Sequence, residues 1–312
     1  MENPANQVKM NLDQDEVTRA VADRYAAGAQ AVENELCCPV DYNAQYLKVM
    51  PAEILERDYG CGDPSKYLQP GETVLDLGSG GGKICYIASQ VVGKEGRVIG
   101  VDMTPDMLDL ARRHQAAVAE KIGWSNVKFL RGRIEDLELN YDRLDQWLRA
   151  NPVTDVASYE AMEAERERLC RDEPLVASDS MDAVVSNCVL NLVAPDFKRQ
   201  LFAEIFRVLK EGGRAVISDI VAAQEVPLAM QQDPELWSGC ISGAFEEQAF
   251  HDAFVAAGFS DIEILVRQEQ PWRVVSGIEF RSVTLAAYKG KGGRRLEAEA
   301  TDGGCSPKGG CC

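Results

Sequence analysis

The stretch from Val74 to Gly82 constrains the fold of this chain more than any other part of the sequence. An apolar run, Val74 to Leu77, leads directly into a turn with glycine at four of five positions, and a helical pattern starts near Lys83. Glycines relieve the steric cost of a sharp strand-to-helix reversal, and their bare amides at a helix N-terminus can receive a polar or anionic ligand group. The sequence therefore predicts a nucleotide-type ligand site at this turn.

The spacing of the glycines distinguishes three kinds of nucleotide loop. The dinucleotide fingerprint needs a third glycine where Lys83 stands, and the phosphate-binding P-loop needs glycine at Leu77 and Ser or Thr at Ile84. Neither pattern is present. A loop with an acidic residue inside the strand, here Asp76, resembles that of S-adenosylmethionine (SAM) methyltransferases. A plain structural turn is the alternative interpretation.

Length and charge narrow the class of protein. The 312 residues can bury a sizeable core, as one large domain or two smaller ones. The formal net charge of -17 would repel a phosphate backbone, so we expect no nucleic-acid partner. Residues 1–7 lack the basic start and apolar core of a signal peptide, and no later segment has the apolar length of a membrane span. We therefore expect a soluble, cytoplasmic protein that does not bind membranes.

Strand and helix patterns alternate through the middle of the chain. The sequence predicts five strands, at 74–77, 97–101, 127–130, 182–187 and 214–220. It predicts helices from about Asp13 to about Asn34 and at 52–57, 84–92, 105–122, 195–210 and 246–257. Gly212 and Gly213 would close the helix at 195–210. Two further strands are predicted at 262–267 and 280–288. This alternation predicts an α/β fold with a doubly wound, mostly parallel sheet and helices on both faces.

The same pass along the chain predicts four parts. N-terminal helices and a cysteine-containing loop occupy 1–58, and the ligand-binding domain occupies 59–221. That domain carries a charged insertion at about 137–180, where apolar residues are sparse and opposite charges recur at helical spacing. A smaller C-terminal substrate domain follows at 222–289. The polar, glycine-rich tail at 290–312 is expected to be disordered.

Acidic residues follow the predicted strands where a nucleotide-type ligand would lie. Asp102 stands twenty residues beyond Gly82, at the end of the second strand, within reach of a ribose's hydroxyls; capping the helix from Pro105 is the alternative. Beyond the third strand, Ile134 could flank an adenine ring and Glu135 could hydrogen-bond to it. The predicted cofactor-binding residues are Asp76, Gly78, Gly80, Asp102, Met103, Ile134, Glu135 and Asn187.

Ten cysteines are many for a cytosolic chain. Thiols stay reduced in that compartment, so the cysteines indicate metal, metalloid, redox or catalytic use more than structural disulfides. Cys61 has glycine on both sides, Cys188 directly follows the fourth strand, and Cys240 lies in a run of small residues. Free cysteine is often simply buried, and Cys85 keeps that structural interpretation. Cys170, in the charged insertion, is expected to be incidental.

With these pieces placed, the chain resembles the arsenite SAM methyltransferases. The resemblance covers roughly residues 35 to 290 and is carried by Tyr59-Gly60-Cys61-Gly62, the loop from Asp76 to Gly82, Asp102-Met103-Thr104, the run from Ser186 to Leu192, and Gly239-Cys240 followed by Ser242-Gly243. It implies a class I, Rossmann-like methyltransferase fold. It also implies that Cys188 and Cys240 bind trivalent arsenic, and that Cys61 joins them or forms a redox disulfide with Cys37 or Cys38.

The implied activity is the methylation of trivalent arsenic in arsenic detoxification. Arsenite or its thiol conjugates would be the substrate, SAM the methyl donor, and glutathione or thioredoxin the thiol reductant, with the chain acting as a monomer. Trivalent arsenic is thiophilic, so cysteine thiolates suit it as they suit other soft ions. Two alternatives remain open. One is a SAM methyltransferase for an organic small molecule, with structural cysteines; the other is a non-catalytic thiol-rich binder of metalloids.

Overall fold

The computed structural model describes residues 14–33 and 40–290. Cys37, Cys38 and the predicted tail from 291 onward lie outside the described residues. The described helices are α1 (Gln14–Gln30), α2 (Ala44–Leu47), α3 (Ala52–Glu56), α4 (Lys83–Val92), α5 (Pro105–Ile122), α6 (Tyr141–Ala150), α7 (Val156–Asp172), α8 (Pro195–Val208), α9 (Leu228–Gln231), α10 (Pro234–Ser238) and α11 (Glu247–Ala256), with short 3-10 turns η2 (Pro64–Tyr67) and η3 (Leu190–Leu192).

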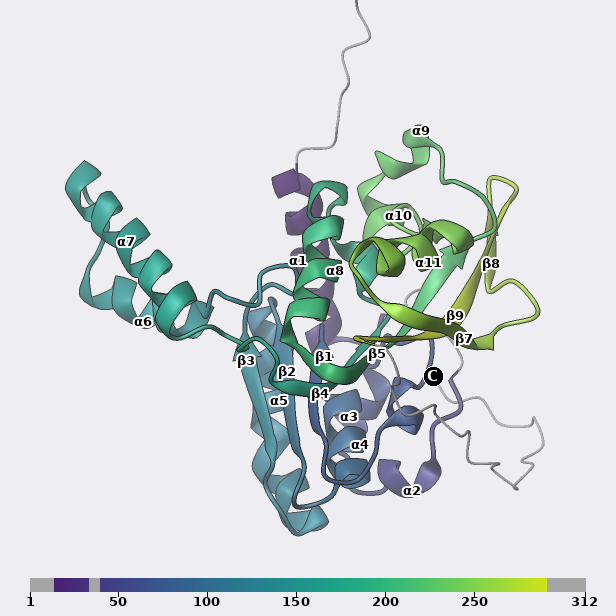
Figure 1. Ribbon diagram of the computed structural model, residues 1–312, viewed down its shortest axis with the longest axis horizontal. Coiled ribbons are helices and arrows are strands. Elements are labelled where there is room, and N and C mark those ends of the chain that lie inside the picture. Colours follow the sequence, from purple (N-terminus) through teal and green to yellow (C-terminus); the bar gives the residue numbers. More distant parts are fainter. Residues whose placement is uncertain (1–13, 34–39, 291–312) are drawn as a thin grey trace, which may run out of the picture.

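One sheet runs through the molecule in the order β3-β2-β1-β4-β5-β9-β7 (Figure 1). The strands are β1 (Thr73–Leu77), β2 (Arg97–Asp102), β3 (Val127–Arg131), β4 (Met181–Asn187), β5 (Leu209–Ala222), β6 (Phe245–Glu246), β7 (Ser260–Arg267), β8 (Arg273–Val275) and β9 (Ile278–Tyr288). The first five are parallel, β9 is antiparallel to β5, and β7 is antiparallel to β9. The predicted doubly wound, mostly parallel sheet is confirmed.

Helices cover both faces of this sheet because alternate strand residues point to opposite sides. In β1, Leu75 and Leu77 belong to the core on the side of α8 and α11, whereas Val74 belongs to the core on the side of α4 and α5. All three side chains are completely buried. The carboxyl ends of the central strands are therefore held rigidly between two packed layers.

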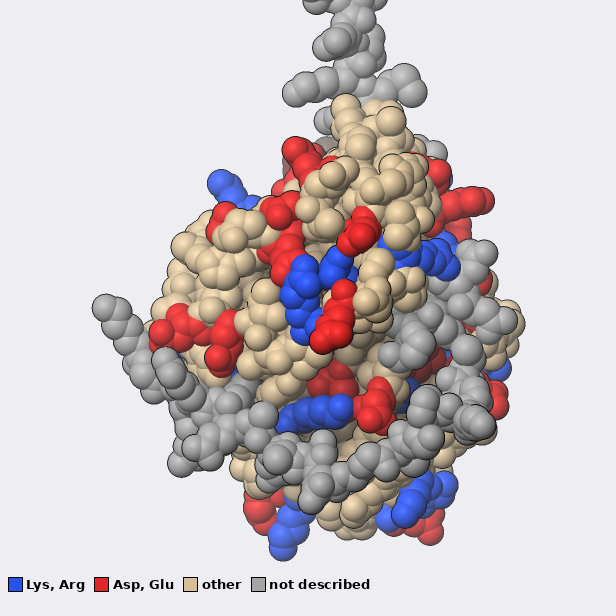
Figure 2. All heavy atoms as spheres, turned by 90° about the vertical axis from the view of Figure 1, so that its right-hand side faces the viewer, with Lys and Arg blue, Asp and Glu red and all other residues tan. Residues whose placement is uncertain are grey.

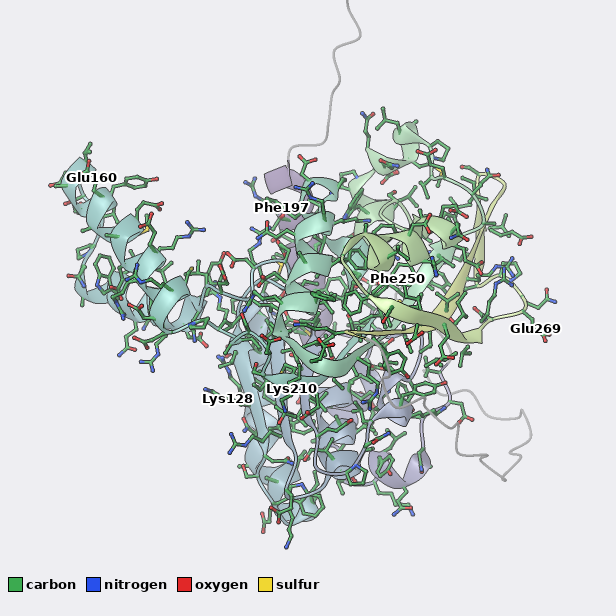
Figure 3. The ribbon with its side chains drawn as sticks, in the orientation of Figure 1. Lys128, Glu160, Phe197, Lys210, Phe250 and Glu269 are labelled. Carbon is green, nitrogen blue, oxygen red and sulfur yellow. The ribbon has the colours of Figure 1, made fainter. Side chains whose placement is uncertain are left out.

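An aromatic cluster fixes α8 and α11 over the sheet. The ring of Phe202 on α8 lies 4.8 Å from that of Phe254 and 6.4 Å from that of Phe250, both edge to face. Figure 3 shows Phe250 directed from α11 into the interior. Edge-to-face aromatic pairs add to the burial energy, so this cluster anchors the region expected as a C-terminal substrate domain, whose strands β7 and β9 extend the same sheet.

One predicted boundary is wrong. The sequence places the end of the helix from Pro195 at about Lys210, closed by Gly212 and Gly213, but α8 ends at Val208. Strand β5 already begins at Leu209, which pairs with Met181, and regular pairing resumes at Arg214. The glycines therefore serve a bulge inside β5, where Gly212 has a φ of +80°, and not a helix terminus.

The charged insertion forms a helical arm that projects from the body of the molecule (Figure 1). Its helices are α6 and α7, and Glu160 lies toward its far end (Figure 3). None of the α6 residues is buried. The neck of the arm, which contains Leu137 and Val176, is buried instead. The Val176 N–H donates to the carbonyl of Leu137 at 2.9 Å, and both side chains lie in the main core. The predicted span 137–180 thus combines an exposed arm with a buried neck.

Two observations relate to the expectation that the chain binds neither membranes nor nucleic acid. No helix among the described residues is both long enough and apolar enough to cross a bilayer. On the face that carries the C-terminal strands, Lys and Arg side chains are interleaved with Asp and Glu, without a broad basic surface among the described residues (Figure 2).

The difference between arm and neck gives a stability prediction. Replacing residues 141–172 with a short Gly-Ser linker should leave the free energy of unfolding nearly unchanged, since this segment buries little apolar surface. Leu137→Ala should lower it by about 2–5 kcal/mol, because a fully buried side chain is removed from the main core. Urea unfolding of the two variants measures both values. A shortened chain that loses as much stability as Leu137→Ala would contradict this account of the arm.

Candidate functional site

The glycine loop between β1 and α4 adopts a backbone that only glycine accommodates well. Gly78, Gly80 and Gly82 have φ values of +68°, +49° and +89°. A Cβ atom on Gly78 would lie 2.4 Å from Val189, and one on Gly82 would lie 2.7 Å from Phe129. A Cβ on Gly80 would meet nothing closer than 4.0 Å. The loop is therefore packed tightly on its protein side and open at Gly80.

Asp102, at the end of β2, is tied to this loop. Its Oδ2 accepts a hydrogen bond from the Gly80 N–H at 2.9 Å, and its Oδ1 accepts one from the Thr104 N–H at 2.8 Å. Burial is the main cause of a raised pKa for this carboxyl, which the two backbone donors partly offset. The carboxylate is held at the wall of a pocket, which suits hydrogen bonding to ligand hydroxyls.

Asp76 lies beneath the loop and is almost completely buried. Burial raises its pKa to about 7, and the hydrogen bond that the Cys85 thiol donates to Oδ2 at 3.1 Å opposes the shift. The nearby Asp102 carboxylate raises the pKa further. Cys85, expected to be structural, is thus a neighbour of a predicted cofactor residue. A positively charged ligand group above Asp76 would stabilise its ionised form.

One pocket contains the whole predicted cofactor set. It is lined by Asp76, Gly78, Gly80, Asp102, Met103, Ile134, Glu135 and Asn187. Glu135 is held by an ion pair of 2.6 Å between its Oε1 and the Nε of Arg133. In the same wall the buried Ser79 hydroxyl has no hydrogen-bond partner among the described residues. An unpartnered buried hydroxyl and an open glycine fit a polar nucleoside ligand such as SAM.

Helix α1 closes one side of this pocket, which the sequence did not indicate. Val21 and Tyr25 of α1 line the pocket, and the Tyr25 ring packs edge to face on Tyr59 at 6.1 Å. The hydroxyl of Tyr59 donates to the carbonyl of Gly28 at 2.9 Å. Arg24 donates to Ser238 Oγ at 3.1 Å, next to the Cys240 loop. Helix α1 therefore links the Tyr59 and Cys240 segments across the pocket.

Asn187 fixes the loop that carries Cys61. Its Oδ1 accepts hydrogen bonds from the N–H groups of Cys61 at 2.9 Å and Gly62 at 3.1 Å, and its Nδ2 donates to the carbonyl of Gly62 at 2.8 Å. A Cβ atom on Gly60 would lie 2.0 Å from this amide. Asn187 lines the pocket as the sequence suggested, but its described hydrogen bonds go to protein groups.

Three cysteines distant in sequence lie together beside this pocket. Cys188 lines the pocket, and its sulfur lies within 4.8 Å of the sulfur of Cys61. The Cys240 thiol donates to the carbonyl of Cys188 at 3.3 Å. Cys61, Cys188 and Cys240 are 5, 4 and 5% exposed, and no disulfide joins any two of them. Their thiols therefore share one water-poor corner of the pocket.

Two of these cysteines have a backbone conformation that is rare for residues with a side chain. Cys188 has a φ of +62° and Cys240 one of +61°. Non-glycine residues are uncommon in this region and cost of order 1–3 kcal/mol, so such conformations cluster at functional sites. The Cys188 N–H donates to the carbonyl of Ser218 at 2.8 Å. The fold holds both thiols in place despite the strain.

Sequence reasoning missed Asp219, which lies directly beside these thiols. A carboxylate oxygen of Asp219 is within 4.8 Å of the sulfurs of Cys61 and Cys188. Burial raises the pKa of Asp219 to about 7, while backbone hydrogen bonds and Lys198 oppose the shift. Burial lowers the pKa of Lys198 to about 8. The available signal was position, since Asp219 lies near the carboxyl end of the fifth predicted strand, 214–220, as Asp102 follows the second.

Tyr25 also contacts the thiol corner. Its hydroxyl hydrogen-bonds with Cys240, and its pKa is raised well above the usual value by burial and then by the neighbouring Cys240 and Cys188. A residue of α1 thus borders both the pocket and the thiols. No feature of the N-terminal sequence other than its helical pattern pointed to this position.

Comparisons with known proteins agree with this geometry. Residues 68–258 match a family described as a methyltransferase domain. The arsenite methyltransferase of Halobacterium salinarum is 37% identical over 212 residues, which are 67% of this chain and 43% of that protein. Human arsenite methyltransferase is 31% identical over 251 residues, 78% of this chain and 57% of that protein. The chain spans about half the length of these curated relatives.

A crystal structure shares the fold over most of both chains. It is that of an arsenic(III) SAM methyltransferase from Chlamydomonas reinhardtii, with 30% sequence identity and a TM-score of 0.64, covering 82% of this chain and 76% of that one. The predicted resemblance is confirmed: this chain belongs to the arsenite S-adenosylmethionine methyltransferase family.

Proposed function

We propose that this chain methylates trivalent arsenic, supplied as arsenite or a thiol conjugate, with SAM as methyl donor. The observation that carries the proposal is the meeting of Cys61, Cys188 and Cys240 at the wall of the glycine-loop pocket. The proposed role is arsenic detoxification. The activities for which its relatives are named and the resemblance of the pocket to a nucleoside site support it.

In this proposal the three sulfurs are the arsenic ligands. Trivalent arsenic prefers soft thiolates, and three of them form a neutral complex that a buried corner can hold without uncompensated charge. When bound, SAM supplies an electrophilic methyl group that the arsenic lone pair can attack. The site then needs no strong general base, and the protein acts mainly by positioning.

The remaining residues divide the work of positioning between donor and acceptor. Asp102, Gly80 and Ser79 would hold the polar groups of the donor, and Asp76 would face a positive charge on it. Cys188 is the residue common to the pocket and the thiol corner. Tyr25 and Val21 of α1 would exclude water from the corner where the two meet.

The redox part of the proposal concerns Cys61. Transfer of the methyl group would break its bond to the sulfur of SAM and raise arsenic from the +3 to the +5 state. We infer that Cys61, together with Cys37 or Cys38 (both outside the described residues), would return two electrons to arsenic by forming a disulfide. Glutathione or thioredoxin would then reduce that disulfide. This chemistry needs a reducing compartment, so the proposal places the enzyme in the cytoplasm. The proposal also takes the enzyme to be a monomer. Mass mapping of disulfides after turnover without reductant would identify the partner of Cys61.

The thiols give the first prediction of this section. Cys188→Ser and Cys240→Ser should each lower the formation of methylated arsenic at least about tenfold, because arsenic would keep only two of three sulfur ligands. Cys170→Ser, on the projecting arm, is the matched control and should retain activity. The measurement is arsenic speciation after incubation with arsenite, SAM and a thiol. Full activity of Cys188→Ser would favour an organic substrate with structural cysteines.

The pocket gives the second prediction. Asp102→Ala should weaken SAM binding by about tenfold to hundredfold, because a hydrogen bond to a charged group contributes about 1.5–3 kcal/mol. Asp109→Asn, an exposed change on α5, should leave the dissociation constant unchanged. Calorimetric titration with SAM measures both. Equal SAM affinity in Asp102→Ala and the wild-type chain would contradict the assignment of Asp102. If the wild-type chain gave no heat with SAM even in the presence of arsenite, only the non-catalytic metalloid binder would remain as an interpretation.

A further inference from the structure

A second ligand set overlaps the proposed arsenic ligands. Cys61, Cys188 and Asp219 each place one ligand atom within 4.8 Å of the other two, and all three residues are buried. The sulfur of Cys240 is not a member of this group and contacts the Cys188 carbonyl instead. Two thiols and a carboxylate are a different donor set from three thiols, and donor type decides which ion is preferred.

We propose that Cys61, Cys188 and Asp219 bind a thiophilic divalent cation, Zn²⁺ or Cd²⁺, and that this cation and arsenic exclude each other. Zinc takes cysteine sulfur and carboxylate oxygen in tetrahedral sites with a Zn–S distance of about 2.3 Å, which separates two sulfurs by about 3.8 Å. The present spacing, below 4.8 Å, must therefore contract by at most about 1 Å. Side-chain rotation alone can supply this.

The carboxylate is already aimed by its own hydrogen bonds. Asp219 Oδ1 accepts hydrogen bonds from Asn191 Nδ2 at 2.8 Å and from the Ile220 N–H at 2.8 Å. Its Oδ2 accepts from the Leu190 N–H at 2.9 Å, and its contact with the Asn191 N–H is longer, at 3.4 Å. Oδ2 is thus the oxygen with capacity for a cation. Such outer-shell bonds orient the ligands of metal sites.

Charge balance favours a divalent occupant. Two thiolates and the Asp219 carboxylate carry three negative charges, and the Lys198 ammonium, which interacts with Asp219 and Cys240, carries one positive charge. A divalent cation brings this buried group to neutrality, which low-dielectric surroundings require. Three thiolates on trivalent arsenic are neutral by themselves and leave the charges of Asp219 and Lys198 to offset each other at a distance. Asp219 is therefore a ligand of the cation alone, and Cys240 is a ligand of arsenic alone.

Access to the site is through the pocket, because Cys188 lines it. Binding forms two metal–sulfur bonds and releases the two thiol protons to solvent, so no oxidant or reductant is involved. Only the exclusion of arsenic rests on the proposed function; binding of the cation can be measured without arsenic. With the cation bound, the shared cysteines could not hold arsenic, so the cation would inhibit the methylation of arsenic.

The test uses the full-length chain with Cys37, Cys38, Cys305, Cys311 and Cys312 changed to Ser, which removes the cysteines outside the described residues. Cd²⁺ is titrated at about pH 8.5, where Asp219 is already ionised, while sulfur-to-cadmium charge-transfer absorption and proton release are recorded. We expect one Cd²⁺ with two thiolates and about two protons released, and displacement of Cd²⁺ by Zn²⁺. No binding, or a signal from three thiolates with three protons, would overturn the proposal.

Two variants in this background make opposite predictions. Asp219→Asn should weaken Cd²⁺ binding about tenfold or more and leave the arsenite dissociation constant within about twofold. Cys240→Ser should weaken arsenite binding and leave Cd²⁺ binding unchanged. Cys170→Ser is the control and should change neither. Cd²⁺ binding that is as tight in Asp219→Asn as in the parent chain would rule out this carboxylate as a ligand.

Thermal melts and SAM titration show whether Asp219→Asn is folded, since Asp219 also supports the turn after Cys188. If that variant unfolds, the decision rests on Cys240→Ser and the proton count, and weakened Cd²⁺ binding in Cys240→Ser would overturn the proposal. Cd²⁺ binding without arsenite binding would refute the proposed function alone. Arsenite methylation without Cd²⁺ binding would refute this inference alone.

Discussion

The side-chain amide of Asn187 is the interaction on which the arrangement of the site depends. It lies at the end of β4, one residue before Cys188, and binds the backbone of Cys61 and Gly62 through its oxygen and its nitrogen. Because β4 is buried between two layers of helices, this amide transfers the rigidity of the sheet to a loop 126 positions earlier in the chain. The distance between Cys61 and Cys188 therefore follows from the sheet, and Gly60 and Gly62 are needed so that the loop can approach closely enough.

The pocket and the thiol corner are parts of one edge of the sheet. Strands β1, β2 and β4 end at the glycine loop, Asp102 and Cys188, and open α/β sheets bind ligands at this carboxyl edge. Asp219 lies near the end of the neighbouring strand β5 and supports the turn that follows Cys188. The donor and acceptor of the proposed methyl transfer would thus be placed by neighbouring strands of one rigid unit, and α1 covers the place where they meet.

Sequence reasoning succeeded where the signal was local. Glycine spacing in the loop, the apolar runs of the central strands and the position of Asp102 depend on a few neighbouring residues, and the structure places them accordingly. It failed where the signal was a contact between distant segments. Asp219, Tyr25 and Lys198 were not singled out, because contacts with segments distant in sequence bring them to the site. Leu137 and Val176 were assigned to a solvated insertion because charge dominates that stretch, although both pack in the core. Gly212 was interpreted as a helix end because glycine is common there, whereas tertiary pairing of Leu209 with Met181 ends the helix earlier.

The left-handed backbone of Cys188 and Cys240 has a consequence for ligand affinity. A flexible peptide that gathers thiols around an ion loses conformational entropy at the moment of binding, and that loss weakens the complex. Here two of the thiols are set in position by strained residues that folding has already immobilised. The entropy loss therefore belongs to folding of the whole chain and not to capture of the ion. Such preorganisation favours tight binding at low ion concentration.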